Sequence, residues 1–251
     1  MSGPSLLRVA DAEAVAGEAA EELAGAAARA VAERGRFTLA LAGGSTPRRL
    51  YALLASPDAP FRARVPWDRT HVFFGDERAV PPEHPDSNYR MAREALLAHV
   101  APASVHRIRA EQPGAAEAYE AELRAFFGVP TGDDPPSLDL VLLGLGPDGH
   151  TASLFPGDAV LEEARRWVAT TLGARLGTRR TTLTLPVLNR ARAVVFLVAG
   201  PEKAGALRRV LAPEPGAELL PAARVRPDRG SVLWLADAAA ASGLEGEGPG
   251  T

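Results

Sequence analysis

His150 is the side chain in this sequence best suited to chemistry, and it closes a glycine-rich run that starts at Gly144. Histidine suits general-base work because its ordinary pKa lies near ~6.5. Asp148 stands two residues earlier, where a carboxylate either fixes the tautomer of the ring or simply caps the turn. A lone histidine is more often structural, but this one follows an apolar run that predicts a strand. The other four histidines (His71, His84, His99 and His106) show no metal-ligand spacing, so no metal site is expected.

The same glycines, Gly144, Gly146 and Gly149, match the Gly-x-Gly-x-x-Gly pattern of dinucleotide-binding folds. That pattern requires a helix directly after it and an acidic residue at the end of the next strand. The next predicted strand, 167–171, ends without an acid, and Pro147 lacks the amide that a pyrophosphate would use. A nicotinamide or flavin site is therefore rejected, and no cofactor is expected.

A second polar run, Gly43-Gly44-Ser45-Thr46-Pro47, follows another apolar stretch. We expect Thr46 to cap a helix whose first residue is Pro47. Glycines that let the backbone approach a ligand, followed by free helix amides, are typical of a phosphate cradle, although an ordinary strand-to-helix turn fits equally well. Ser45 as a nucleophile is disfavoured, because Pro47 replaces the second glycine of a nucleophile elbow.

The third run, Asp76-Glu77-Arg78, places three charges directly after an apolar stretch. Such charges are costly unless they face a wet cleft or pair with one another. Arg78 can bind a phosphate through two parallel hydrogen bonds, and Asp76 or Glu77 can orient a cation or a sugar hydroxyl. A solvated loop with a structural ion pair is the alternative. Ser87 is expected to cap the following helix.

The elements that position these runs follow from hydrophobic periodicity. The predicted strands are 37–42, 70–75, 138–143, 167–171, 181–185, 193–199 and 231–235. The predicted helices are 11–34, 47–54, 87–99, 115–127 and 202–211. Buried strands that alternate with helices predict an α/β fold with a mostly parallel sheet and helices on both faces. Because ligands bind beyond the carboxyl ends of such strands, the three polar runs are expected to converge.

Composition restricts the classes of partner. The chain has 251 residues, no long linker, and a glycine-rich end, so we expect a single domain over 1–251 with a frayed tail from 243 to 251. A net charge of -3 provides no basic excess for nucleic acid. The absence of cysteine excludes disulfides and thiolate chemistry. No signal peptide or membrane-length apolar run is found, so a cytoplasmic location is expected. We also expect a monomer.

Taken together, the motifs resemble the glucosamine-6-phosphate isomerase/6-phosphogluconolactonase family. The matching stretches are 42–47, 75–78 through 87–89, 138–156, 180–189, 195–203 and 220–222. The resemblance implies a Rossmann-like three-layer sandwich without a nucleotide. It also implies a pentose-phosphate-pathway hydrolase that converts 6-phospho-D-glucono-1,5-lactone to 6-phospho-D-gluconate. The residues that match the family's site are Gly44, Ser45, Thr46, Arg78, His150, Arg180 and Lys203.

Two alternatives remain beside the lactonase. The related deaminases carry Asp-Glu-Tyr where this chain has Asp76-Glu77-Arg78, and their histidine motif continues to an extra acid that this chain lacks, which favours the lactonase. A sugar-phosphate-binding regulator would keep the cations but would not need His150 or Asp148. For the lactonase, we expect His150 to activate a water, while Arg78, Arg180, Lys203 and the Gly44–Thr46 loop bind the phosphate. Donors to the oxyanion would come from amides near Gly44 or Gly146, or from a nearby cation.

Overall fold

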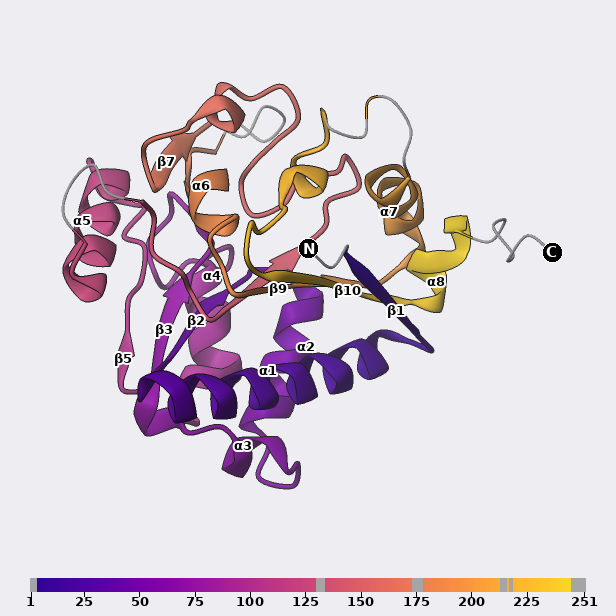
Figure 1. Cartoon of the computed structure of the whole chain (residues 1–251), viewed down its shortest axis with the longest axis horizontal. Coiled ribbons are helices and arrows are strands. Elements are labelled where there is room, and N and C mark those ends of the chain that lie inside the picture. The colour runs from indigo at the N-terminus through magenta and orange to yellow at the C-terminus, as the bar shows by residue number, and fades with distance from the viewer. Residues whose placement is uncertain (1–3, 130–133, 173–177, 213–215, 217–218, 245–251) are drawn as a thin grey trace.

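The chain folds around a seven-stranded sheet in which every pair of neighbouring strands is parallel (Figure 1). The computed structural model describes residues 4–129, 134–172, 178–212, 216 and 219–244. Across the sheet the order is β1 (Ser5–Val9), β10 (Ser231–Asp237), β9 (Ala193–Val198), β6 (Leu140–Gly144), β2 (Phe37–Leu41), β3 (Thr70–Phe74) and β5 (Ser104–Val105). The predicted parallel α/β sheet is confirmed. β1 and β5, at its two edges, were not predicted, because they are short and partly exposed.

Helices cover both faces of this sheet. Those longer than a single turn are α1 (Ala12–Arg34), α2 (Ser45–Ala55), α4 (Asn88–Ala92), α5 (Ala115–Phe127) and α7 (Ala204–Leu211). Shorter ones are α3 (Phe61–Arg64), α6 (Leu185–Leu188) and α8 (Ala238–Ala241). In Figure 1, α1, α2 and α3 lie on one side of the sheet and α6 and α7 on the other. The three-layer sandwich is therefore as predicted.

Neighbouring strands β2 and β6 form the switch point of the sheet. After β2 the chain continues to β3 and β5 on one side, whereas after β6 it continues to β9 and β10 on the other. The connections that leave two such strands diverge, so a crevice opens beyond their carboxyl ends. The glycine runs after Leu41 and after Leu143 both begin at this crevice.

A second, three-stranded antiparallel sheet stands beside the first, in the order β4 (Asp76–Arg78), β8 (Arg180–Leu183) and β7 (Val168–Thr171). The strands predicted over 167–171 and 181–185 both form, and they belong to this antiparallel sheet. The connection between them, residues 172–179, is too short for a parallel crossover, which needs about a dozen residues or more. Gly75 joins the two sheets, because its N–H donates to Leu41 and its carbonyl accepts from Leu183.

Several helix ends differ from prediction. Thr46 is not a cap: α2 begins at Ser45, and the cap position is Gly44, which has no side chain to offer. The predicted Ser87 cap is confirmed, since its Oγ accepts from the Arg90 N–H at 3.1 Å. The helix expected over 87–99 is α4 followed by a π-helical turn, η2 (Arg93–Leu97). The helix expected from 202 begins as a 3-10 turn, η4 (Pro201–Lys203).

Further 3-10 turns in the described part of the chain include η1 (Trp67–Arg69), η3 (Ala159–Glu162), η6 (Pro221–Arg224) and η7 (Ser242–Leu244). Of the predicted frayed tail, 245–251 lie outside the described residues, and the preceding residues belong to η7. The single domain stays a prediction. Within the described part of the chain, no helix is both long and apolar enough to cross a bilayer.

Candidate active site

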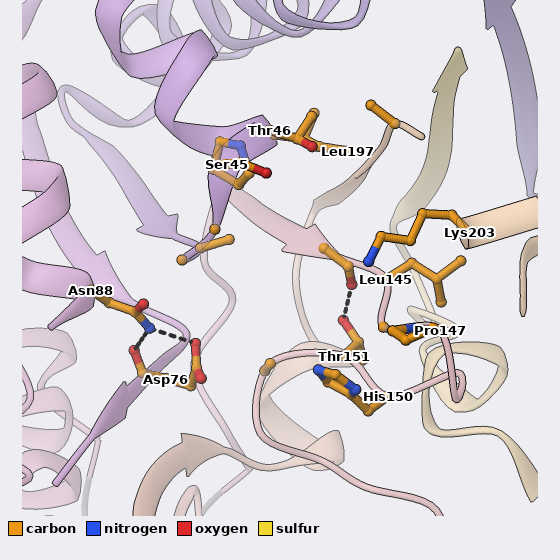
Figure 2. Close-up of a pocket in the computed structure, with 18 of the residues that line it drawn as sticks. Ser45, Thr46, Asp76, Asn88, Leu145, Pro147, His150, Thr151, Leu197 and Lys203 are labelled. Carbon is orange, nitrogen blue, oxygen red and sulfur yellow. Dashed lines mark hydrogen bonds between the residues drawn. The ribbon is translucent and has the colours of Figure 1, made fainter. Parts of the chain in front are cut away.

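A pocket of about 230 Å³ lies at the switch point, beyond the carboxyl ends of β2 and β6. The predicted site residues that line it are Gly44, Ser45, Thr46, Asp76, Arg78, His150, Arg180 and Lys203. Figure 2 shows the side chains entering from different directions, with Lys203 opposite Asp76 and with His150 across from Ser45 and Thr46. Two residues named from the motifs, Glu77 and Asp148, are not part of this lining, although Asp148 is hydrogen-bonded to His150.

The α2 wall of the pocket is backbone. Gly44 has φ 109° and ψ 173°, a conformation open essentially only to glycine, and no side chain caps the helix that follows. The preceding Gly43 is equally constrained, because a Cβ there would lie 1.9 Å from Asn88 Oδ1. Among the described residues, no histidine is hydrogen-bonded to Ser45. This wall therefore presents the amide end of a helix to a ligand.

Successive side chains of β4 point to opposite faces of the strand, and this separates its three charged residues. Asp76 and Arg78 line the pocket, whereas Glu77 points to the other face of the strand. Glu77 accepts hydrogen bonds from the N–H groups of Arg78, Asn88 and Tyr89, each at 2.8 Å, and from Ser87 Oγ at 3.1 Å. Burial raises the pKa of Glu77 even against these bonds. Of the two acids offered as ligand groups, only Asp76 reaches the pocket, and Glu77 anchors the start of α4.

Two side chains that the motif analysis did not select hold Asp76 in place. Ser153 Oγ donates to Asp76 Oδ2 at 2.6 Å. Asn88 Nδ2 donates to Asp76 Oδ1 at 3.1 Å (Figure 2). Both residues are buried. Both residues also lie within the stretches that carry the family resemblance. Their position in those stretches was the signal from which they could have been predicted.

Arg78 and Arg180 are directly opposite each other in the β4–β8 pairing. Like charges in that arrangement repel, and each guanidinium has a buried Nε without a partner among the described residues. Burial lowers the pKa of Arg180, Asp76 raises it in part, and Arg78 lowers it further. Within the described part of the chain, Asp76 is the one carboxylate that forms an ion pair with Arg180, at 4.0 Å. Two guanidinium groups held together with so few neighbouring carboxylates are able to bind an anion.

His150 and Asp148 form a hydrogen-bonded pair. His150 Nδ1 lies 2.6 Å from Asp148 Oδ1, and the His150 N–H also approaches that oxygen, at 3.2 Å. Because a carboxylate only accepts, the assigned tautomer carries its proton on Nδ1 and leaves the Nε2 lone pair free. Burial raises the pKa of Asp148, but the hydrogen bonds from His150 outweigh it and hold that pKa below its ordinary value. The carboxylate therefore stays ionised and orients the ring.

Lys203 reaches the pocket from the turn after β9. Gly200 opens that turn with φ 104°, and its N–H lies 3.1 and 3.0 Å from the two carboxylate oxygens of Asp237. Asp237 is buried and also caps α8. The Lys203 ammonium enters the pocket (Figure 2), 3.8 Å from Glu202. No sequence motif pointed to Asp237, because it is distant from Gly200 in the chain. Among the described residues, no group of three or more His, Asp or Glu is arranged to hold a metal ion.

The fold and site define a known class. A family model described as glucosamine-6-phosphate isomerases/6-phosphogluconolactonase matches residues 10–234, and the chain belongs to that family. Within it, a relative from Synechocystis sp. named 6-phosphogluconolactonase is 47% identical over 86% of this chain and 88% of its own length. A relative of the same name from Rattus norvegicus is 40% identical over 96% of this chain and 90% of its own length.

Comparison with solved structures supports the same family and fold. The crystal structure of 6-phosphogluconolactonase from Leishmania guyanensis superposes with a TM-score of 0.85 at 29% identity, covering 98% of this chain and all of that one. A monomeric glucosamine-6-phosphate deaminase superposes with a TM-score of 0.75 at 21% identity, which shows a common fold only. The predicted family and fold are confirmed.

Proposed function

We propose that this chain, acting as a monomer, hydrolyses 6-phospho-D-glucono-1,5-lactone to 6-phospho-D-gluconate, with His150 activating the attacking water. The enzyme class, a carboxylic ester hydrolase of the pentose phosphate pathway, rests on the curated relatives that are 40–47% identical to this chain over the aligned residues. The observation that carries the mechanism is the oriented His150–Asp148 pair, which adjoins a pocket that is also lined by Arg78 and Arg180.

The two ends of the pocket suit the two ends of the substrate. Arg78, Arg180 and the amide end of α2 attract the phosphate, because cations and helix N-termini both favour anions. Asp76, fixed by Ser153 and Asn88, accepts from a sugar hydroxyl. The lactone carbonyl then lies toward His150.

The tautomer of His150, with its proton on Nδ1, makes Nε2 the atom that accepts the proton of the water. His150 Nε2 removes a proton from a water as the water oxygen bonds to C1 of the lactone, and the carbonyl becomes an oxyanion. Collapse of the tetrahedral intermediate breaks the bond between C1 and the ring oxygen, and His150 returns the proton to that oxygen. Asp148 stabilises the imidazolium between these steps.

The oxyanion donors follow by elimination. In the turn that carries His150, the Gly146 N–H donates to the His150 carbonyl at 2.8 Å, the Gly149 N–H donates to Gly146, and Pro147 has no N–H. The amides of Gly146 and Gly149 are therefore occupied. Lys203 and the amides after Gly44 remain, and both belong to the pocket wall. Because the amides of α2 face the phosphate, we assign the oxyanion to Lys203.

The test is a coupled assay with the lactone, in which the spontaneous hydrolysis rate is subtracted. Glucosamine 6-phosphate, monitored for ammonia release, is the control for the deaminase alternative. Turnover of the lactone without ammonia release supports the proposal. Ammonia release, or binding of 6-phosphogluconate without turnover of either substrate, would overturn it in favour of a deaminase or a regulator respectively.

A further inference from the structure

Phe155 contacts the candidate base and the candidate phosphate anchor with a single ring. Its ring centroid lies 4.7 Å from that of His150, with the planes inclined by 35°. The Arg180 guanidinium carbon lies 5.6 Å from the same centroid. Phe155 is 7% exposed, and the mechanism above gives it no role. It closes the short turn formed by the bridge between Thr151 and Leu154.

Arg180 needs a contact that leaves its N–H groups free. It faces Arg78, its nearest carboxylate is 4.0 Å away, and that carboxylate already accepts from Ser153. The face of an aromatic ring attracts a cation through its quadrupole, most strongly where water is excluded. Such a contact holds the guanidinium without using any of its hydrogen-bond donors. These donors therefore remain available to a phosphate.

The His150 ring must likewise be held by a contact that does not use its Nε2 atom. Asp148 fixes Nδ1 but, through one hydrogen bond, still allows the ring to swing about it. Packing against Phe155 limits that swing without a hydrogen bond to Nε2. The lone pair that takes the water proton is thus left unoccupied.

We propose that Phe155 is a positioning residue for lactone hydrolysis, one ring that sets the separation between the imidazole of His150 and the guanidinium of Arg180. It holds both groups by its π surface and leaves their reacting atoms free. The inference rests on the proposed function for its catalytic part, but its Arg180 part concerns phosphate binding alone.

A fluorinated series at position 155 tests this role. Phenylalanine is replaced by its 4-fluoro, 3,5-difluoro and 3,4,5-trifluoro analogues, which change the volume little but weaken the negative face of the ring. We expect the Kd of 6-phosphogluconate, measured by calorimetry, to rise with each added fluorine, by about tenfold over the series. A packing role alone would leave the Kd flat.

Phe155→Leu removes the ring altogether, and we expect kcat to fall about tenfold together with a rise in KM. Phe73→Leu is the matched control, since Phe73 is fully buried and stacks on His106 at 4.4 Å, outside the pocket. It removes the same kind of contact, so it should lower the melting temperature but leave kcat and KM unchanged.

The outcomes separate this inference from the proposed function. An active lactonase with a flat fluorine series, and with Phe155→Leu no worse than Phe73→Leu, would overturn the role of Phe155 alone. Weakening of 6-phosphogluconate binding along the series, in a protein that does not hydrolyse the lactone, would overturn the function and leave the Arg180 contact standing.

Discussion

The Cα of Gly146 lies directly against the imidazole of His150. A Cβ built on Gly146 would fall 2.0 Å from His150 Nδ1 and 2.2 Å from Cε1. The missing side chain at Gly146 is therefore what lets the ring reach Asp148. Glycine is required at this position by the close approach of a neighbouring ring, since its φ is not left-handed.

Gly146→Ala should consequently lower kcat by roughly a hundredfold, because the methyl group pushes the imidazole away from Asp148. Gly144→Ala is the matched control. Gly144 lines the same pocket and begins the same run, but a Cβ there meets no atom within 4 Å. Steady-state kinetics of both variants test whether kcat depends on the position of the His150 ring. Equal loss in the two variants would mean that the turn, and not the ring position, is at fault.

The facing arginines lead to a prediction about affinity. Arg180→Met keeps the aliphatic stem and removes the charge, so KM should rise about 10- to 100-fold, the usual effect of losing a charged hydrogen bond. The melting temperature should not fall, since repulsion from Arg78 is relieved. Arg190→Met serves as the control, because Arg190 also has a buried Nε without a partner among the described residues but lies outside the pocket. A KM that stays unchanged in Arg180→Met would place the phosphate elsewhere.

His150→Ala should separate chemistry from binding. Loss of the base should lower kcat by a factor on the order of 10² or more. The Kd of 6-phosphogluconate should stay nearly constant, because the cations and the α2 amides remain. The two quantities are measured by initial rates and by calorimetry. Near wild-type turnover in this variant would remove His150 from the mechanism.

The two acids of β4 should behave oppositely. Glu77→Gln leaves donors facing an amide NH₂ group and should reduce the free energy of unfolding by about 1–3 kcal/mol with little change in KM. Asp76→Asn should raise KM with a smaller loss of stability, since Asp76 faces the pocket. Urea unfolding and steady-state kinetics of both variants provide the comparison. A reversed pattern would contradict the assigned orientation of β4.

Glu77 also predicts a pH dependence of stability. Its pKa is raised above the ordinary 4.5, so the ionised form is penalised in the fold. Glu77 therefore stabilises the protein most below pH 4.5, and that contribution declines as pH rises from 4.5 through the raised value. Because Gln does not titrate, the difference between wild type and Glu77→Gln should change over this window. A pH-independent difference would argue against the raised pKa.

The local parts of this molecule were readable from its sequence. Apolar runs and helical periodicity predicted the interior of the parallel sheet and the helix over 115–127, because burial on both faces dictates residue type strand by strand. The convergence of the three polar runs followed from one rule, that parallel strands point their carboxyl ends to the same edge. His150, Ser45 and Arg78 were found this way.

Tertiary structure decided what depends on partners distant in the chain. Antiparallel pairing placed Arg180 opposite Arg78, and the register of that pairing is invisible in either segment alone. The hydrogen bonds from the Gly200 N–H to Asp237 and the contact of Phe155 with Arg180 also join residues distant in the chain. Sequence patterns report which face of an element is buried, whereas the identity of the group across from it is set only when the elements pack. For this protein, the residue types of the site came from sequence, and their mutual geometry came from the fold.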